Sequence, residues 1–491
     1  MNRTLRRAGI AVTILLLAVI GQLTYLQVVA ADRLADDPRN VRRLTRDFSR
    51  PRGDIVTSDG VIVAHSVPSH DELVYRRVYP EGPLYAQVGG YQSFVFGNTG
   101  VEATYNDPLV GRDARLQLRN VRDLLTGRPQ TGTVVLSLSD QVQRVARDAL
   151  AGQRGSVVAL DVASGGVIAL YSNPTFDPNV MTSHDFAAVQ GAFDLLRADP
   201  ANPALARAYR ETYPPGSTFK TVTASVALRT GTATPETEFP VLTSLPLPQS
   251  TTSISNFGRE ACGGTLFVSF TRSCNTTFAR LGLELGDRFV PGMSRFGIGL
   301  APPLDVRPGA VESTGPAPGS FRQNQPAFAM AGIGQGPDLR VTPLEMALVA
   351  AGIANQGAIM RPHVVAEIRD YQRRVVSRTR PSRWLTATDP ATAAEVTKMM
   401  ISVVNDPRGT GTAARIPGVT VAGKTGTAET GPDANPHAWF IAFAPAEAPR
   451  FAVAVLVEHG GNRGSEATGG RVAAPIARAV LQAALALPAG S

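Results

Sequence analysis

The chain begins with a continuous apolar run that contains no charged residue, from residue 8 to residue 29, preceded by Arg3, Arg6 and Arg7. At about 1.5 Å of rise per residue, a helix of this length measures roughly 33 Å and can cross roughly 30 Å of hydrocarbon. The pattern predicts a tail at 1–7 and a transmembrane anchor at 8–29. A cleaved signal peptide is the alternative, because Val28-Val29-Ala30 resembles a small-residue cleavage site.

Two regions follow the anchor, and they differ in the length of their apolar segments. Up to residue 150 the candidate elements are short and mixed, with a hairpin signal at Ser58-Asp59-Gly60. Beyond that point the apolar segments are longer, and two of them, 156–162 and 167–171, form a predicted hairpin. We therefore expect a first domain at 30–150, of a pedestal or dimerisation-like kind, and a second domain at 151–491.

The second domain combines apolar strands with helices. Besides the hairpin, the patterns predict strands at 439–444 and 451–457 and helices at 344–355, 391–404 and 472–487. Strands this apolar are typical of a sheet that is buried on both faces. We expect an α+β fold in which helices cover both faces of a largely antiparallel sheet. Two stretches rich in proline, glycine, serine and threonine are predicted surface loops, at 234–255 and 301–321.

Composition narrows the functional classes. With 491 residues, of which 43% are hydrophobic, the chain is too long for one compact unit. The net charge of +8 comes from scattered arginines without a cluster of aromatic and basic residues. That distribution argues against nucleic-acid binding and leaves a mild attraction to anionic lipid headgroups. The six histidines are dispersed and no metal-ligand spacing is visible, so neither a metal nor a cofactor is predicted.

Lysine is rare in this chain, which has only Lys220, Lys398 and Lys424. The first lies in Ser217-Thr218-Phe219-Lys220, directly after Tyr213-Pro214-Pro215-Gly216, a sequence that is typical of the start of a helix. Residues three apart share a helix face, so the Lys220 amine can lie beside the Ser217 hydroxyl. The pair is a candidate nucleophile with its base. The alternative is an N-capping serine followed by a surface lysine.

Two further short motifs carry polar groups in the same order along the chain. Ser273-Cys274-Asn275 precedes a helical pattern at 276–283, and its alternative reading is a pair of capping residues. Lys424-Thr425-Gly426-Thr427-Ala428 follows the strand-like segment 419–422. A glycine there lets another backbone approach a strand edge, as recognition of a peptide by strand addition requires. The alternative is a lysine in a β-turn with a structural glycine.

Together, S-x-x-K, S-x-N and K-T-G in this order form the motif set of penicillin-binding proteins and serine β-lactamases. The chain resembles class B penicillin-binding proteins over almost its whole length, and most closely their actinobacterial branch. Segments outside the three motifs that share the resemblance are Arg52-Gly53-Asp54-Ile55, Asp59-Gly60, Gly100-Val101-Glu102, residues 332–336 and residues 341–347.

The resemblance implies a penicillin-sensitive serine D,D-transpeptidase that cross-links peptidoglycan stem peptides. Ser217 would be the nucleophile and Lys220 its base, with a pKa lowered by burial and by the Lys424 charge. Ser273 would relay a proton to the departing D-alanine, and Asn275 would hold the substrate amide and position Lys220. The remaining expected roles are the terminal-carboxylate site at Lys424, Thr425, Gly426 and Thr427, and an oxyanion hole from the backbone N–H groups of Ser217 and Thr427. We expect the Ser217 hydroxyl to lie between the two motif lysines.

The resemblance also implies partners and a location. Stem peptides and their lipid-linked precursor would be the substrates, and β-lactams covalent inhibitors. No glycan-polymerising domain is recognisable, so a polytopic membrane glycosyltransferase is the expected partner. The tail would be cytoplasmic and the catalytic domain extracytoplasmic. One alternative is a D,D-carboxypeptidase. Another is a serine β-lactamase or drug sensor, but the chain lacks an E-x-x-L-N segment between the second and third motifs. A third is a scaffold of the elongation or division machinery with secondary catalysis.

The two cysteines, Cys262 and Cys274, are candidates for a disulfide. They lie twelve residues apart in a region expected to be exported, where a disulfide can persist. Cys274 also stands where related proteins commonly have aspartate, so a bridge would lie beside the second motif.

Overall fold

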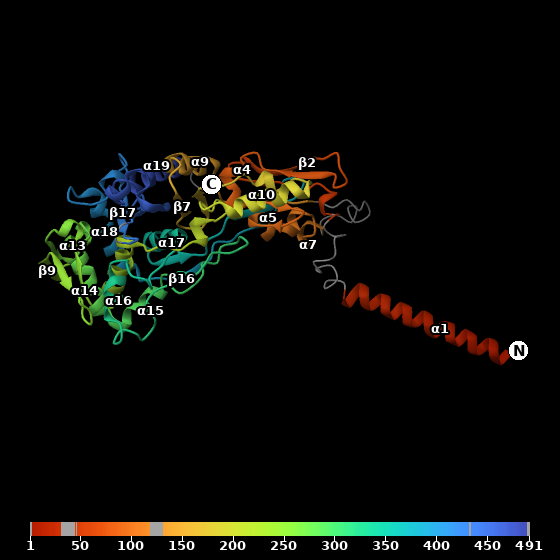
Figure 1. The fold of residues 1–491 in the computed structure, drawn as a ribbon, viewed down its shortest axis with the longest axis horizontal. Helices are drawn as coiled ribbons and strands as arrows, with labels where there is room; N and C mark the ends of the chain where they lie inside the picture. Colours follow the sequence, from red (N-terminus) through yellow and green to blue (C-terminus); the bar gives the residue numbers. More distant parts are fainter. Residues whose placement is uncertain (1, 31–44, 46, 118–130, 432–433, 489–491) are drawn as a thin grey trace.

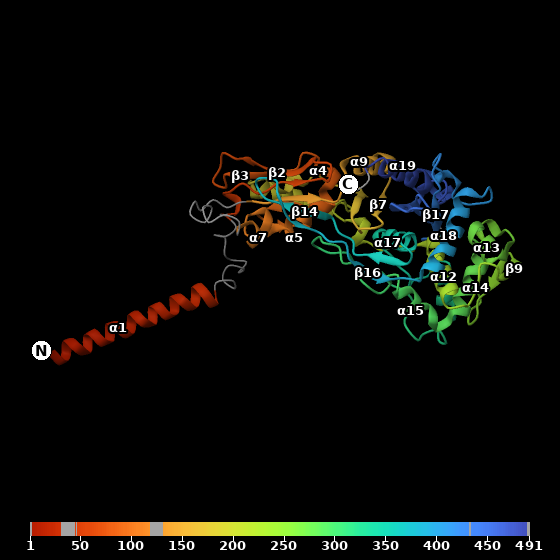
Figure 2. The same cartoon turned by 180° about the vertical axis from the view of Figure 1, so that it is seen from behind.

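A computed structural model describes residues 2–30, 45, 47–117, 131–431 and 434–488. The N-terminal helix α1 (Asn2–Thr24) continues into the π-helical turn η1 (Tyr25–Val29) and stands apart from the rest of the molecule (Figures 1 and 2). It is long and apolar enough to cross a membrane, and none of its most apolar window is buried against the protein. These properties are consistent with a single-pass anchor, because an apolar helix without a protein partner is stable in lipid.

The first domain is built on a six-stranded sheet in the order β15-β14-β6-β1-β2-β3. Its first hairpin is the predicted one, with β1 (Ile55–Val56) antiparallel to β2 (Ile62–Pro68). The other strands are β3 (Tyr75–Val78), β6 (Thr133–Leu136), β14 (Val365–Arg369) and β15 (Val375–Arg378). Figure 2 shows β14 lying among the elements of the first domain although it comes from the second half of the chain.

Short elements complete the first domain around a buried ion cluster. They are α4 (Gly82–Gly89), β4 (Gln92–Ser93), β5 (Gly97–Asn98), α5 (Gly100–Thr104), α6 (Asn106–Leu109) and α7 (Ala114–Gln117). At the centre of the cluster, the Glu102 carboxylate accepts hydrogen bonds of 2.6 Å from Arg52 Nε and from Arg77 Nε, and one of 3.2 Å from the Tyr79 hydroxyl. These fully buried charges explain why the Arg52 and Glu102 segments belong to one structural unit.

The second domain is centred on a five-stranded sheet in the order β17-β18-β19-β7-β8, in which every neighbouring pair is antiparallel. Its strands are β17 (Ala422–Ala428), β18 (His437–Ala444), β19 (Phe451–Val457), β7 (Gly155–Asp161) and β8 (Val167–Asn173). Helices α9 (Asp140–Leu150) and α19 (Ala473–Leu485) pack on one face, and α17 (Pro343–Ala354) packs on the other. All residues of β18, β19 and α17 are buried, as a sheet covered on both sides requires. The predicted fold class is confirmed.

A mostly helical lobe lies beside the sheet (Figure 1, yellow-green to teal). It contains η3 (Gly216–Phe219), α12 (Lys220–Arg229), α13 (Leu266–Arg272), α14 (Asn275–Leu285), η5 (Gly286–Arg288), α15 (Phe289–Ser294) and α16 (Gln325–Gly332). Helix α18 (Pro390–Asn405) packs against α12, α13 and β17 and so connects this lobe to the sheet. The remaining elements are η2 (Pro178–Met181), α10 (Phe186–Ala198), α11 (Arg207–Arg210), η4 (Phe257–Arg259), β13 (Ala358–Met360), β16 (Arg383–Thr386), η6 (Thr412–Ala414) and η7 (Glu458–Glu466).

One of the two loop predictions needs correction. Residues 234–255 contain β9 (Glu238–Leu242), β10 (Ser244–Pro246) and β11 (Ser253–Ser255), and β9 pairs with β12 (Cys262–Thr265). Proline and threonine obscured these strands, whose stability comes from pairing with other segments. Residues 301–321 do lack a named helix or strand, yet Leu304, Val306 and Ser313 within them are buried.

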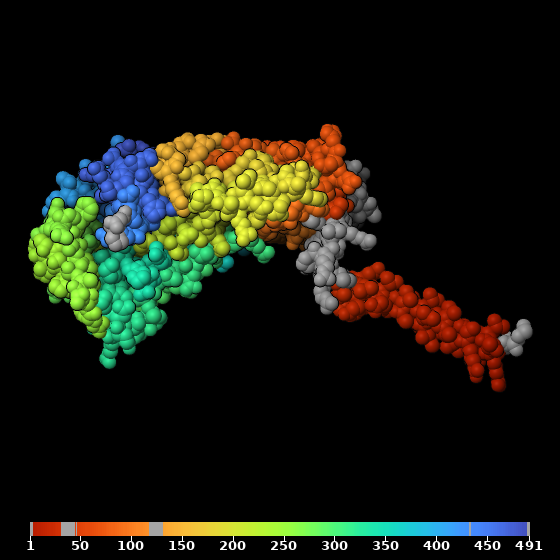
Figure 3. Space-filling view, viewed as in Figure 1, coloured from red at the N-terminus to blue at the C-terminus, as the bar shows by residue number. Residues whose placement is uncertain are grey.

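The two domains exchange segments across the predicted boundary at residue 150. Helix α9 precedes that boundary but packs on the five-stranded sheet beside α19, whereas β14 and β15 follow it and extend the sheet of the first domain. The antiparallel pairing of β14 with β6 joins the domains through backbone hydrogen bonds. In the space-filling view of Figure 3 the two domains accordingly form one continuous, elongated body.

Candidate active site

Ser217 lies in the short 3-10 turn η3, which leads directly into α12 with Lys220 as its first residue. Side chains three residues apart eclipse one another in such a turn, so the two side chains project from the same face. Tertiary hydrogen bonds hold the turn, from Trp439 Nε1 to the Pro214 carbonyl (3.0 Å) and from Gly216 N to the Gly334 carbonyl (2.8 Å). Ser217 is partly exposed and its hydroxyl has no hydrogen bond with a described residue, so it is accessible to a substrate.

Two glycines let the Ser217 turn fit between neighbouring backbones. Gly216 has a φ of 54°, and a Cβ on it would lie 2.7 Å from the Thr427 carbonyl oxygen of β17. Gly334 has a φ of 81°, and a Cβ on it would collide with the Gly216 carbonyl. Only glycine meets both conditions, a left-handed backbone and a contact with no room for a side chain. The glycine-rich segment at 332–336 is therefore the support behind the Ser217 turn.

Ser273 is the meeting point of the three motifs. Its hydroxyl is within 3.2 Å of Lys220 Nζ and 2.9 Å of Lys424 Nζ. The residue caps the end of α13 in the left-handed conformation, with φ 62° and ψ 41°. A residue other than glycine is strained there, at a cost of about 1–3 kcal/mol, and such strain clusters at functional sites. The hydroxyl that the structure places between the two amines is thus that of Ser273, where the motif spacing had led us to expect Ser217.

The Lys220 amine is buried among hydrogen-bond acceptors. It donates to the Ser273 carbonyl at 2.8 Å and to Asn275 Oδ1 at 2.7 Å. Asn275 in turn donates from Nδ2 to the Ser255 carbonyl at 2.9 Å, which sets the orientation of its amide. Burial, followed by the nearby Lys424 charge, holds the pKa of Lys220 well below its ordinary value, and burial lowers the pKa of Lys424 to about 7. A lysine in this setting is able to accept a proton near neutral pH.

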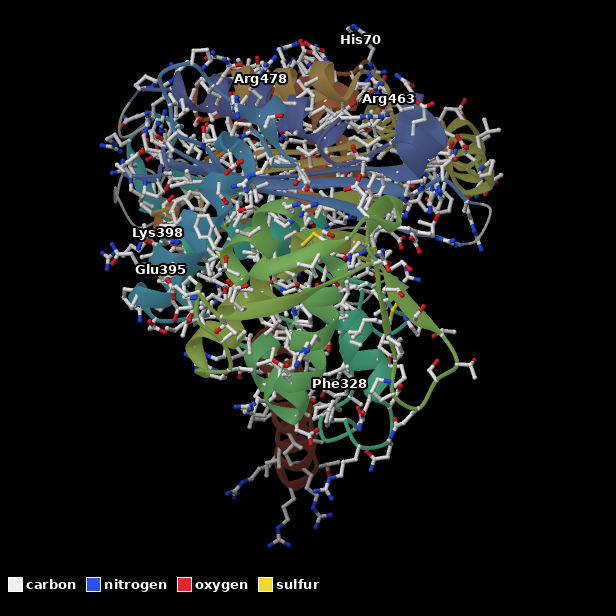
Figure 4. The ribbon with its side chains drawn as sticks, turned by 90° about the vertical axis from the view of Figure 1, so that its left-hand side faces the viewer. His70, Phe328, Glu395, Lys398, Arg463 and Arg478 are labelled. Atoms are coloured by element: carbon white, nitrogen blue, oxygen red, sulfur yellow. A yellow bond between two sulfur atoms is a disulfide. The ribbon has the colours of Figure 1, made fainter. Side chains whose placement is uncertain are left out.

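The third lysine lies elsewhere. Lys398 is exposed on the surface of α18 and pairs with Glu395 at 2.6 Å, as Figure 4 shows at the edge of the molecule. The buried lysines are therefore the two in the motifs.

The K-T-G motif lies within β17 itself, which corrects the prediction of a strand at 419–422 that ends before the motif. β17 is the terminal strand in the order of its sheet, where an extended peptide can add. Thr425 Oγ1 lies 2.6 Å from Thr410 Oγ1, and Gln335 Nε2 reaches the Thr427 carbonyl at 3.5 Å. The Lys424 amine also donates to the Thr425 carbonyl at 3.1 Å.

Gly426 lies in close contact with other segments of the chain. A Cβ on it would lie 2.9 Å from the Pro215 carbonyl oxygen, 2.9 Å from Thr218 Cγ2 and 3.0 Å from Trp439 Cβ. The glycine therefore makes room for the turn that carries Ser217.

A disulfide joins Cys262 to Cys274, with Cα atoms 5.4 Å apart. It links β12 to the residue between Ser273 and Asn275. Figure 4 draws it as a yellow bond where the green helical lobe meets the blue sheet. The bridge thus restrains the backbone of the second motif, in addition to its hydrogen bonds with the lysines.

Sequence reasoning missed several residues that support the site. Asn256 donates to the Leu242 carbonyl at 2.7 Å and accepts from Thr276 N at 3.0 Å, which ties β9 to the start of α14. Gly469 lies so close to the backbones of Gly426 and Trp439 that it has no room for a Cβ. The Gly469-Gly470 pair was a visible signal, whereas nothing distinguished Asn256 from other loop asparagines. Within the described residues, no group of three His, Cys, Asp or Glu side chains could hold a metal ion.

Comparison with known proteins defines the class to which this fold and site belong. Residues 155–482 match the penicillin binding protein transpeptidase domain, and residues 52–135 match the penicillin binding protein A dimerisation domain. The chain belongs to the penicillin-binding protein transpeptidase family, and the resemblance inferred from the three motifs is confirmed.

Particular relatives are similar over nearly the whole chain. The peptidoglycan D,D-transpeptidase PbpA of Mycolicibacterium smegmatis is 43% identical over 99% of each chain, and PbpA of Mycobacterium tuberculosis is 41% identical over 99% of each chain. Among solved structures, the ceftriaxone acyl-enzyme complex of penicillin-binding protein A from M. tuberculosis has a TM-score of 0.82 and 39% identity, covering 90% of this chain and all of that one.

Proposed function

We propose that the chain is a membrane-anchored peptidoglycan D,D-transpeptidase that is acylated by β-lactams and by stem peptides at Ser217. The observation that carries the proposal is the Ser273 hydroxyl lying within hydrogen-bond distance of both Lys220 and Lys424. That arrangement offers a proton path between a buried amine and the departing group of a substrate. The similarity to proteins named D,D-transpeptidases, and to a solved β-lactam acyl-enzyme, supports the same reaction.

In the proposed acylation step, Ser217 Oγ attacks the carbonyl carbon of the penultimate D-alanine. The hydroxyl proton passes to the neutral Lys220 amine as the C–O bond forms. When the C–N bond breaks, Lys220 returns the proton through the Ser273 hydroxyl to the nitrogen of the departing D-alanine. The amine of a neighbouring stem peptide then attacks the ester, loses its proton along the same path and restores the Ser217 hydroxyl.

The other polar groups bind the substrate in this proposal. Lys424, Thr425 and Thr427 receive the terminal carboxylate, and the stem peptide lies along the outer edge of β17. The backbone N–H groups of Ser217 and Thr427 stabilise the oxyanion, helped by the positive end of the α12 dipole. Asn275 holds the substrate amide and positions Lys220, to which it is bonded at 2.7 Å.

The proposed location is outside the cytoplasmic membrane, with the arginine-bearing tail inside. The disulfide supports this orientation, because disulfides persist in oxidising compartments. A separate membrane glycosyltransferase would supply the glycan strands, and the anchor with the first domain is the proposed contact for it. We propose domain limits of 30–150 and 151–491, with α9 packing in the second domain and β14 and β15 in the first.

The test is covalent labelling of the full chain by a fluorescent penicillin, followed by mass mapping of the labelled peptide. We expect the label on the peptide that contains Ser217 and none on Ser217→Ala. A matched control is Ser250→Ala, at an exposed turn residue, which should label like the wild type. Label retained by Ser217→Ala would overturn the assignment.

A second measurement concerns the acceptor. The enzyme is incubated with stem-peptide substrate, and cross-linked dimers are separated from shortened monomers by mass spectrometry. Cross-linked dimers support the transpeptidase. Shortened monomers alone would make it a carboxypeptidase, and rapid hydrolysis of penicillin would make it a β-lactamase.

A further inference from the structure

A cavity of about 260 Å³ lies at the junction of the two domains, away from the three motifs. Tyr105, directly after α5, forms one side, and the rest of the wall comes from later segments of the chain, at residues 303–305, 361–363, 379, 380 and 382. Its volume is just below the range of about 300–1,000 Å³ that is typical of small-molecule sites. The cavity therefore fits a small ligand that contacts both domains.

Among the described residues that line this cavity, the only carboxylate is already hydrogen-bonded. Asp305 accepts hydrogen bonds from the Tyr105 hydroxyl (2.6 Å), from Val364 N (2.6 Å) and from Val365 N (3.2 Å). It fastens the first domain to the start of β14, and three donors satisfy its oxygens. Asp305 therefore has a structural role, and its single negative charge is outnumbered by the two arginines in the same wall.

Two arginines in the same wall have no counter-ion. Arg361 and Arg380 are both exposed, and neither forms an ion pair with any residue that the structure describes. Next to them, Pro303, Leu304 and Pro362 form an apolar surface. Guanidinium groups bind carboxylates through paired N–H donors, and an apolar wall suits the aliphatic part of the same ligand. An isolated phosphate would leave that wall uncovered.

We infer that this cavity is a second binding site for a small acidic peptide, held by Arg361 and Arg380 through its carboxylates. This inference rests on the proposed function, because that function supplies the ligand class, the acidic stem peptide of peptidoglycan. The site lies where backbone pairing connects the domains. His363 in its wall exchanges backbone hydrogen bonds with Gly165 and Val167 of the catalytic hairpin, at 3.2 and 2.9 Å. A bound peptide thus lies beside both Asp305 and the catalytic domain.

The experiment uses the full-length Ser217→Ala protein in detergent, which cannot be acylated at Ser217, and follows binding by calorimetry. The probes are the dipeptide L-alanyl-γ-D-glutamate, its uncharged diamide and inorganic phosphate. We expect the dipeptide to bind more tightly than the other two. Adding Arg361→Gln and Arg380→Gln should weaken it at least about tenfold, since charge-assisted contacts are lost. Adding Arg383→Gln instead, an exposed arginine of the same region outside the cavity, should leave it unchanged.

Several results would overturn the second site. They are a lack of dipeptide binding, equal binding of the diamide or of phosphate, and binding that survives loss of both arginines. With Ser217 intact, the Arg361→Gln/Arg380→Gln protein should still be labelled by penicillin, which also shows that it is folded. Loss of the cavity site with normal labelling would leave the proposed transpeptidase in place, and failed labelling of the wild type would remove the transpeptidase instead.

Discussion

Lys424 Nζ donates a 2.9 Å hydrogen bond to the Ser273 hydroxyl, although the two residues are 151 positions apart in the chain. The lysine belongs to the terminal strand of the sheet and the serine to the helical lobe, so this bond spans the division between them. Because Lys220 contacts the same hydroxyl from α12, the protonation state of either amine affects the other.

The rate of acylation should depend on pH through both lysines. Lys220 acts as a neutral base, and its lowered pKa means that activity rises with pH and levels off well below the range of a free lysine amine. Lys424 binds a carboxylate in its charged form, so activity should fall as pH rises through its pKa of about 7. We expect a bell-shaped profile in second-order acylation by fluorescent penicillin. Lys424→Arg should move the falling limb to higher pH, and a profile that is flat between pH 5 and pH 10 would contradict both roles.

Two replacements of Ser273 should distinguish the effect of its hydroxyl from the effect of its backbone conformation. Ser273→Ala and Ser273→Gly both remove the proton relay, and each should slow acylation by about 10²- to 10⁴-fold. Only glycine relieves the left-handed backbone, so Ser273→Gly should unfold at a higher temperature than Ser273→Ala, by an amount equivalent to about 1 kcal/mol. Thermal unfolding and labelling rates measure the two effects. Normal labelling in either variant would rule out the relay.

The disulfide should stabilise the second motif. Because the bond restricts the unfolded chain, reduction or the Cys262→Ser/Cys274→Ser change should cost about 2–4 kcal/mol and should slow acylation. Thiol counts in unfolded protein, with and without reductant, establish whether the bond is present. As a control, the reductant should have no effect on the double variant. Equal thiol counts in the wild type under both conditions would argue against the bridge.

Glu102 should be essential for the stability of the first domain. Its carboxylate is fully buried between Arg52 and Arg77, and Glu102→Gln leaves two buried guanidinium groups without their counter-charge. The expected loss of stability is about 3–5 kcal/mol. Asp107→Asn, which removes the carboxylate of an exposed pair with Arg112, should change stability by less than about 1 kcal/mol. Protease sensitivity and thermal unfolding compare the two, and similar stabilities would contradict the role of Glu102.

Local pattern was sufficient for the elements that are continuous apolar runs. The strands beginning at Gly155 and Phe451 and helix α17 lie within a few residues of their predicted positions, because an element buried on all sides requires apolar residues along nearly its whole length. The pattern failed for β9 and β17. Strand β9 depends on pairing with β12, and β17 carries polar motif residues that interrupt the apolar run.

The sequence by itself determined the family, the order of the three motifs and the presence of an apolar N-terminal helix, since each of these depends on short segments of contiguous residues. Only the tertiary structure decided that Ser273 is the hydroxyl between the two amines, that Gly426 and Gly334 make room for the Ser217 turn, and that β14 extends the sheet of the first domain. Those relationships join residues far apart in the chain. Their geometry comes from packing and backbone pairing, which no local pattern records.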